Sequence, residues 1–417
     1  MKQLLTALLL LAAFATLRAA DPMLTSYSAS QCEGSLTPYP TDINPAVYPD
    51  SLTPVFINHV GRHGARYPAS AVNCMTMRRA LERADSAGTI TPAGRKLRQL
   101  NEYIITLSTD RWGSLDSLGM AEQRAIATRM FYNFGEAFSG GTVNAISSYS
   151  PRAMMSMYSF THQLDRMDNR INFVTTTGRM NSPIMRFFDL DTEFVEYKKQ
   201  GPWLEKYNEY VEQYCPTSAI DKVLGRNFPY SSEREQLQLA LVEYYVIAGC
   251  SAMSVDCNTT EYFTKDEYNA LWSCFNLRQY LCRTATTVSS LPADIASELL
   301  TNLITTTEEF IEGNSPASVQ LRFGHAETLM PLLSLLHLPG CYYLTNYFDT
   351  VGQHWRDFDV VPMAANLQMI LFKAKGSGRY YLRVDLNEKP VSLIPNNTAR
   401  YIPWQQAREY MLRCLPL

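Results

Sequence analysis

The chain has 417 residues, of which 46% are hydrophobic and 18% are charged, and its formal net charge is −3. This composition is typical of a folded globular protein and excludes a largely disordered chain, while the length predicts two domains or one domain with a large insertion. Because the chain is slightly acidic, general binding to nucleic acid is excluded, and any affinity for phosphate must be local.

The first 20 residues have the features of a secretory signal peptide. Lys2 supplies a positive start, residues 4–17 are almost wholly apolar, and the small residues Ala19 and Ala20 fit a cleavage site. The apolar run is shorter than the roughly 20 residues that span a bilayer, and no later segment is long and apolar enough to do so. We therefore expect an exported protein, periplasmic or secreted, without a stable membrane anchor.

Nine cysteines permit disulfides in an exported chain, but an odd number leaves at least one thiol unpaired. Their spacing leaves the pairing open. The chain contains no C-x-x-C, G-x-x-x-x-G-K, G-x-S-x-G or H-E-x-x-H motif, so the sequence offers no signal for zinc, nucleotide or serine-hydrolase chemistry. We expect neither a metal nor a cofactor.

The first half of the chain alternates between strand and helix signals. Residues 54–60 form an apolar, β-branched run that predicts a buried strand. Helices are predicted at 75–87, at 92–106 after the Thr91-Pro92 start, and at 117–138. Residues 144–149 predict a second strand, and a helix follows it.

Between about residues 186 and 313 the pattern is almost entirely helical. Apolar residues recur at three-to-four spacing in 192–214, 232–253, 264–284 and 293–311. Strand signals return at 319–323, 367–374 and 380–386. We expect an α/β core sheet flanked by helices, made of residues 21–185 and 314–417, with an inserted α-helical (cap) domain at 186–313. A single mixed fold is the alternative.

Polar side chains follow three of the predicted strands at the point where each strand ends. In an open α/β sheet, the carboxyl ends of the strands line one pocket, so these groups are expected to meet. Arginine binds phosphate oxygens bidentately and is always charged, which makes this a predicted phosphate site. The candidates are Arg62, His63 and Arg66 after the first strand, Arg152 after the second, and His325 and Glu327 after the third.

These residue types suit cleavage of a phosphate monoester. A neutral His63 would attack phosphorus as the nucleophile, and Glu327 would protonate the leaving oxygen. Arg62, Arg66, Arg152 and a protonated His325 would hold the phosphoryl oxygens, so that no metal is needed. The structural alternatives are a helix-terminal carboxylate for Glu327, a core histidine for His325 and an ordinary ion pair for Arg152.

Residues 62–68 read R-H-G-A-R-Y-P, and Arg152 is followed four residues later by Ser156. Together with a late histidine-acid pair, this resembles the histidine acid phosphatases, or branch-2 histidine phosphatases. Most of that family has His-Asp at the late pair, whereas the triplet His325-Ala-Glu327 is similar to that of multiple inositol polyphosphate phosphatases. The resemblance implies hydrolysis of phytate and lower inositol phosphates through a phosphohistidine, without a cofactor.

Two other functions remain open at this point. Within the family, a broad-specificity phosphatase acting on sugar phosphates or other monoesters is the alternative. From another class, a non-catalytic phospholigand-binding protein would need the cations but not a proton donor. Arg186, Lys198 and Lys199 lie where a helical cap could reach additional phosphates, although the sequence alone favours solvated surface charge for all three. The oligomeric state stays open.

Overall fold

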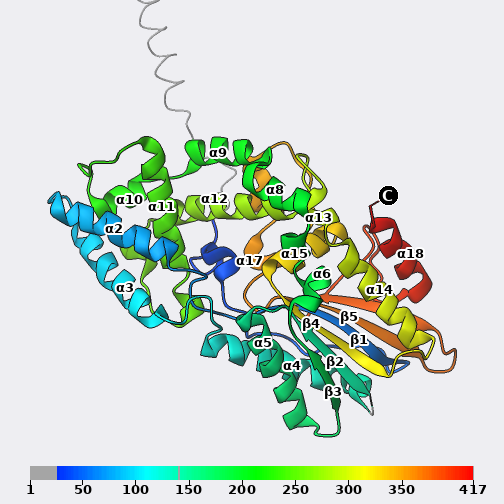
Figure 1. Cartoon of the computed structure of the whole chain (residues 1–417). Coiled ribbons are helices and arrows are strands. Elements are labelled where there is room, and N and C mark those ends of the chain that lie inside the picture. The colour runs from blue at the N-terminus through cyan, green and yellow to red at the C-terminus, as the bar shows by residue number, and fades with distance from the viewer. Residues whose placement is uncertain (1–25, 140, 417) are drawn as a thin grey trace, which may run out of the picture.

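The computed structural model describes residues 26–139 and 141–416 (Figure 1). The predicted signal peptide lies outside these residues. Within them, no helix combines the length and apolar character that crossing a membrane requires. All nine cysteines fall in the described ranges and are free thiols in the structure.

A mixed sheet forms the centre of the lower half of the molecule in Figure 1. Its strand order is β3-β2-β4-β1-β5-β6-β7, and β8 pairs with β6. The strands β1 to β4 run parallel to one another, whereas β5 is antiparallel to β1 and to β6. Their bounds are β1 (Leu52–Arg62), β2 (Thr142–Ser147), β3 (Asn172–Thr176), β4 (Ala317–Gly324), β5 (Asn366–Ala374), β6 (Tyr380–Leu386), β7 (Lys389–Val391) and β8 (Ile402–Pro403).

All five predicted strands are present, and the expectation of an α/β core sheet is confirmed. The sequence did not predict β3, because this edge strand has mostly exposed side chains and therefore lacks an apolar pattern. It also missed β7 and β8, which are only three and two residues long.

The register of the sheet brings three strand ends to the same level. β4 lies between β2 and β1, with Arg62 opposite Gly324 and Ser147 opposite Phe323. Because these strands are parallel, the chain leaves all three at one edge of the sheet. The residues that follow β1, β2 and β4 are therefore neighbours, as the sequence predicted.

Helices cover both faces of the sheet. α4 (Ser117–Phe134) and α5 (Pro151–Met167) share a hydrophobic cluster with one face, whereas α14 (Ser297–Ile311), α15 (Ala326–Leu335) and α18 (Trp404–Cys414) belong to a larger cluster on the other. β1 contributes Phe56 and Val60 to the larger cluster and Ile57 to the smaller, as the alternation of a strand requires. Each such buried side chain contributes about 1.5–3 kcal/mol.

The upper half of Figure 1 is a helical layer, defined here as α2, α3 and α8 to α12. α11 packs on α2, and α10 packs on α3. The division into a core and an inserted cap domain remains a prediction. The bounds of the layer are α2 (Val72–Ser86), α3 (Pro92–Ser108), α8 (Thr192–Gln200), α9 (Trp203–Tyr214), α10 (Thr217–Leu224), α11 (Glu233–Ala248) and α12 (Lys265–Arg283).

The helix predicted at 192–214 is two helices, because the chain breaks at Gly201 and Pro202. Proline has no N–H to continue the ladder of the preceding helix. The predicted start of the helix at 264–284 is confirmed: Thr264 and Glu267 form a reciprocal capping box at the beginning of α12. Shorter helices connect these elements: α6 (Ser182–Met185), α7 (Phe187–Leu190), α13 (Leu291–Asp294), α16 (Val351–His354) and α17 (Asp357–Val360).

Candidate active site

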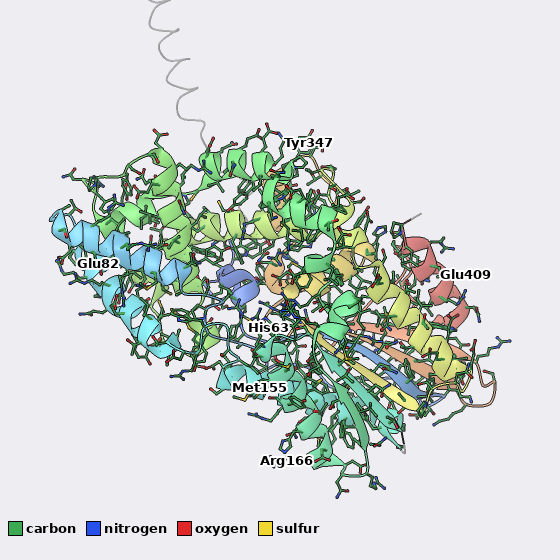
Figure 2. All side chains as sticks on the ribbon, viewed as in Figure 1. His63, Glu82, Met155, Arg166, Tyr347 and Glu409 are labelled. Atoms are coloured by element: carbon green, nitrogen blue, oxygen red, sulfur yellow. The ribbon has the colours of Figure 1, made fainter. Side chains whose placement is uncertain are left out.

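His63 is the first residue after β1 and is held by backbone hydrogen bonds on both sides. Its N–H donates to the carbonyl oxygen of Gly324 at 3.1 Å, and its own carbonyl accepts from the N–H of Ala364 at 3.1 Å. The residue is only 3% exposed. Figure 2 shows His63 in the interior between the sheet and the helical layer, whereas Glu82 and Glu409 lie at opposite edges of the molecule.

The hydrogen bonding of the His63 ring fixes its tautomer. Nδ1 lies 2.9 Å from the carbonyl oxygen of Gly64. Since a carbonyl oxygen can only accept, Nδ1 carries the proton and Nε2 keeps its lone pair. Burial, together with the charges of Arg152, Arg62 and Arg66, lowers the pKa of His63 well below its ordinary value. The imidazole is therefore neutral, with a nucleophilic nitrogen available.

Glu122 of α4 supports the loop that carries His63. Its carboxylate accepts from the N–H of Ala65 at 2.7 Å and from the N–H of Tyr39 at 2.8 Å. The neighbouring Gln123 donates from Nε2 to the carbonyl oxygen of Arg62 at 2.9 Å. α4 thus satisfies backbone groups that burial would otherwise leave unpaired.

Ser156 of α5 links the loop after β1 to Arg152. Its hydroxyl accepts from the N–H of Gly64 at 3.1 Å and donates to the carbonyl oxygen of Arg152, one helical turn earlier, at 2.8 Å. The sequence identified Ser156 only by its spacing from Arg152. The structure explains that spacing, because one hydroxyl fixes both the loop and the first turn of α5.

Three guanidinium groups surround the site, of which that of Arg62 is buried and those of Arg66 and Arg152 are partly buried. Arg62 donates from Nη1 to the carbonyl oxygens of Ser35 and Val361, at 2.6 and 2.5 Å. Burial lowers the pKa of Arg62 to about 10 and that of Arg66 to about 9, so both remain charged at neutral pH. The Nε atoms of Arg62, Arg66 and Arg152 are buried and lack a hydrogen-bond partner in the part of the chain that the structure describes. Buried, unpaired cationic donors favour an incoming anion.

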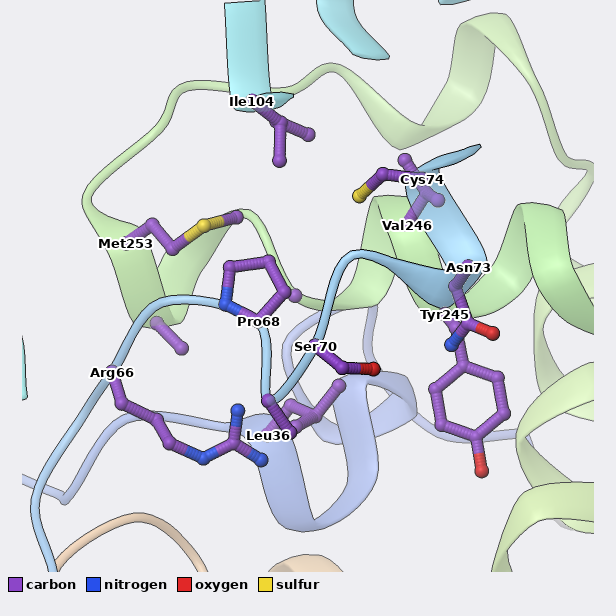
Figure 3. A pocket seen from close by; sticks show the side chains of 13 residues that line it. Leu36, Arg66, Pro68, Ser70, Asn73, Cys74, Ile104, Tyr245, Val246 and Met253 are labelled. Carbon is purple, nitrogen blue, oxygen red and sulfur yellow. The ribbon is translucent and has the colours of Figure 1, made fainter. Parts of the chain in front are cut away.

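An apolar cavity of about 140 Å³ adjoins one of these guanidinium groups (Figure 3). Arg66 lies at the edge of the cavity, next to Leu36 and Pro68. Met253, from the segment that follows α11, forms part of the cavity wall. Apolar walls lower the local dielectric constant, which strengthens the attraction between Arg66 and a bound anion.

His325 is the N-cap of α15, and Thr328 fixes its backbone by accepting from the His325 N–H at 3.0 Å. Nε2 of His325 lies 2.9 Å from Ser148 Oγ and 2.9 Å from Nη1 of Arg186. Guanidinium groups, which can only donate, face both ring nitrogens; the contact of Arg186 with Nε2 is the shorter, so Nε2 is the acceptor and Nδ1 carries the proton. The ring centroids of His63 and His325 are 5.5 Å apart.

The surroundings of His325 oppose the protonation that the sequence led us to expect. Burial first, and then the charge of Arg152, lower the pKa of His325 to about 3. Nδ1 lies 3.5 Å from Nη2 of Arg152, which is also a donor, so the Nδ1–H of the neutral ring stays available to an incoming oxygen. The ring therefore faces the same space as the guanidinium group.

Glu327 lies in the first turn of α15 and forms an ion pair with Arg283, the last residue of α12. Nη1 of Arg283 is 2.6 Å from Oε1 of Glu327, and the Glu327 side chain is 37% exposed. Burial favours a raised pKa, but the charge and hydrogen bond of Arg283 outweigh it and hold the pKa of Glu327 well below its ordinary value. The ion pair with Arg283 therefore favours the ionised form of Glu327.

Arg186 belongs to the site, which corrects the interpretation of this residue as surface charge. Besides its contact with His325, it donates to Asp189 and lies over the rings of Tyr149 and Phe188, at 4.7 and 5.1 Å. Its side chain is only 17% exposed. Composition and spacing gave no signal for this contact, because α6 and α7 bring Arg186 to a strand end that is far from it in sequence.

The two lysines differ from one another. Lys198 donates to the carbonyl oxygen of Phe188 at 2.9 Å and lies 3.7 Å from Asp189, beside Arg186. Lys199 is 67% exposed and lies 3.9 Å from Glu196, which agrees with solvated surface charge. Sequence reasoning also missed Ser148 and Arg283. Ser148 directly follows β2, so its position at a strand end could have identified it.

The six residues expected from the sequence therefore come together from three strand ends, and Ser148, Ser156, Arg186 and Arg283 complete the surroundings. Across residues 26–139 and 141–416, no three His, Cys, Asp or Glu side chains gather in a way that could hold a metal ion.

Two vertebrate proteins are similar to this chain in sequence. The chain is 25% identical over 359 residues to multiple inositol polyphosphate phosphatase 1 of Gallus gallus, which covers 82% of this chain and 78% of that protein. It is 25% identical over 380 residues to the Homo sapiens protein of the same name, covering 84% and 77%.

Solved structures share the fold at lower identity. The Bifidobacterium longum multiple inositol polyphosphate phosphatase in complex with inositol hexasulfate has a TM-score of 0.74 at 17% identity, covering 91% of this chain and 97% of that one. A phytase from D. castellii has a TM-score of 0.72 at 17% identity, covering 96% and 89%.

The family profile described as "Histidine phosphatase superfamily (branch 2)" matches residues 55–387, which is most of the chain. The matched range begins in β1 and ends just after β6, so it contains all three strand ends and the helices between them. The protein is a phosphatase, and the chain belongs to branch 2 of the histidine phosphatase superfamily.

Proposed function

We propose that the protein hydrolyses phytate and lower inositol phosphates through a phosphohistidine on His63. The observation that carries the chemistry is a buried, neutral His63 whose Nε2 is unprotonated, beside guanidinium groups with unpaired donors. The substrate class is supported by the triplet His325-Ala-Glu327 and by the similarity to proteins named multiple inositol polyphosphate phosphatase.

In the first step, Nε2 of His63 attacks phosphorus while the bond from phosphorus to the leaving oxygen breaks. Arg62, Arg66 and Arg152 bind the equatorial oxygens and neutralise the charge of the transition state. Glu327, protonated in the substrate complex, gives its proton to the leaving inositol oxygen. The products of this step are phosphohistidine and the alcohol.

In the second step, water attacks the phosphohistidine. The carboxylate of Glu327 takes a proton from this water as it attacks, and the bond between phosphorus and Nε2 breaks. Inorganic phosphate leaves, and His63 returns to its neutral form. Each turnover restores both residues to their starting protonation states.

His325 binds phosphate in both steps by donating from Nδ1. The negative charge of a bound phosphate opposes the effect of Arg152 and raises the pKa of His325, so the ring gains its second proton only when substrate is present. Arg186 donates to Nε2 of the neutral ring and orients it. Once the ring has gained its second proton, Nε2 donates to Oγ of Ser148 instead.

We also propose that residues 186–313 act as a cap, because they supply Arg186 and Arg283 to the site. Export to the periplasm or the exterior is a further proposal, supported by the pattern of residues 1–20. N-terminal sequencing of the mature protein from fractionated cells tests it: an intact Met1 in the cytoplasmic fraction would contradict it.

The proposed activity is tested by phosphate release from phytate, a sugar phosphate and an aryl phosphate, with a metal chelator present. We expect the highest kcat/KM on phytate for the wild type and none above background for His63→Ala. A preference for the sugar phosphate would instead indicate a broad-specificity phosphatase. Loss of activity in chelator would contradict a mechanism in which arginines supply all of the positive charge.

A further inference from the structure

The proposed acid is held by a residue from the helical layer. Arg283 ends α12, and its ion pair with Glu327 joins this helix to the first turn of α15. Arg283 is 21% exposed and Glu327 is 37% exposed, so a ligand can reach both ends of the ion pair. No further ion pair of Arg283 occurs in the described ranges of the chain.

This ion pair opposes the role proposed for Glu327. A general acid must carry its proton when the leaving oxygen departs, but Arg283 stabilises the carboxylate. Arg62, Arg66 and Arg152 also interact with the charge of Glu327, which makes the carboxylate a counter-ion of these guanidinium groups. Something must therefore replace the carboxylate as the partner of Arg283 before Glu327 can act.

A second phosphate of the substrate has the chemistry to do this. A phosphate dianion carries more charge than a carboxylate and binds a guanidinium bidentately. A second cation of the helical layer, Lys198, lies 3.7 Å from Asp189, the ion-pair partner of Arg186. Lys198 in turn lies beside Phe188, whose ring packs against His325. Arg283 and Lys198 thus place two cations of the helical layer next to residues of the phosphate site.

We propose that Arg283 is a positioning and specificity-determining residue that exchanges its partner during binding. In the free protein it holds Glu327 as the carboxylate. In the complex it binds a phosphate other than the one being cleaved, and the released Glu327 takes a proton from solvent and transfers it to the leaving oxygen. This inference rests on the proposed function and adds that the second phosphate of a polyphosphate itself switches on the acid.

The test uses two variants and a matched control. Arg283→Met removes the positive charge. Arg283→Lys retains the charge but lacks the planar guanidinium group that binds phosphate bidentately. The control is Arg408→Met, which breaks an ion pair between α18 and α14 with Glu308, of similar exposure (35% and 33%). The substrates are phytate, glycerol 2-phosphate as an alkyl monoester, and 4-nitrophenyl phosphate, whose leaving group needs no acid.

For Arg283→Met we expect KM for phytate to rise by about tenfold or more, the effect of losing one charge-assisted hydrogen bond. Because Arg283 lowers the pKa of Glu327, its removal raises that pKa, and the alkaline limb of kcat for glycerol 2-phosphate should move to higher pH. Activity on 4-nitrophenyl phosphate should change little. Arg283→Lys should restore the position of the limb, and Arg408→Met should match the wild type throughout.

A purely structural ion pair predicts a different result. Removing it would lower activity on all three substrates in the same proportion and leave the alkaline limb in place, and that result would overturn the inference. If Arg283→Met does not fold, the pH dependence of kcat of the wild type on two substrates replaces it. The alkaline limb should lie at higher pH on phytate than on glycerol 2-phosphate, because only phytate carries a second phosphate for Arg283, and coinciding limbs would overturn the inference.

Failure of the proposed function gives a separate signature. In that case the wild type would not release phosphate from phytate but would still cleave glycerol 2-phosphate. The alkaline limb on that monoester then decides the inference alone: a shift in Arg283→Met supports control of Glu327 by Arg283, and an unshifted limb contradicts it.

Discussion

Replacing Gly64 with alanine tests whether the loop after β1 needs close backbone packing to position His63. A Cβ added at Gly64 would lie 2.4 Å from the carbonyl oxygen and 2.6 Å from the Cα of Gly119, at the start of α4. Both atoms belong to backbone, so neither can move aside as a side chain can. Ordinary contact begins at 3.4 Å, which means that the loop must shift by about 1 Å.

The size of the effect follows from this shift. Overpacking of a well-packed region typically costs about 1–3 kcal/mol of stability. A displacement of about 1 Å in a reacting group lowers the rate about a hundredfold, and His63 is the direct neighbour of the altered residue. We therefore expect Gly64→Ala to lose about two orders of magnitude in kcat/KM while remaining folded.

The matched control is Gly135→Ala, because Gly135 has a helical conformation (φ −54°) and a Cβ there would meet no atom within 4 Å. This variant should keep its activity and be unchanged or stabilised by up to about 1 kcal/mol. Stability is measured by denaturant unfolding, and kcat/KM is measured with an aryl phosphate as substrate. If Gly64→Ala has the same kcat/KM and the same stability as the wild type, the packing argument is refuted.

Three further substitutions probe the surroundings of the site and the helical layer. Glu122→Gln retains one of two acceptors for buried N–H groups, so denaturant unfolding should show a loss of about 1–3 kcal/mol, and wild-type stability would contradict this support of the loop. Glu327→Gln should lose about 10²–10⁴-fold on alkyl phosphates and far less on an activated aryl phosphate, whereas equal losses would assign the acid elsewhere. Glu243 has two buried oxygens without a hydrogen-bond partner among the described residues, and burial raises the pKa of this carboxyl well above its ordinary value. Its contribution to stability is therefore present below its unfolded pKa of about 4.3 and is lost as pH rises, so the wild type should weaken relative to Glu243→Met from about pH 4 to pH 8, by about 1.4 kcal/mol per unit of pKa difference. A constant difference between the two proteins would contradict this.

Much of the core could be predicted because its signals are local. The β1 run is apolar and β-branched, and the charged residues that follow it mark its end, so the position of His63 could be read from neighbouring residues. Register then follows from the parallel pairing of β1, β4 and β2, which brings the three strand ends together. Helix starts with a local chemical signature, such as Thr264 with Glu267, were equally accessible.

Contacts between elements that are distant in sequence could not be predicted in this way. Arg283 and Glu327 are neighbours only because α12 ends near the first turn of α15, and in the sequence Arg283 resembles an ordinary surface residue. The same holds for Arg186 and His325. The protonation state of His325 also depends on burial and on Arg152, neither of which sequence spacing reports.

The central claim is that His63 becomes phosphorylated during turnover. Rapid alkaline quenching of the enzyme with ³²P-labelled phytate, followed by peptide mass spectrometry, tests it most directly, since phosphohistidine is stable to base and labile to acid. We predict acid-labile label on His63, at no more than one equivalent per chain. With an activated aryl phosphate as substrate, the labelled fraction should be higher in Glu327→Gln than in the wild type, because this variant slows the attack of water on the phosphohistidine. Turnover without label on His63, or label on another residue, would contradict the mechanism.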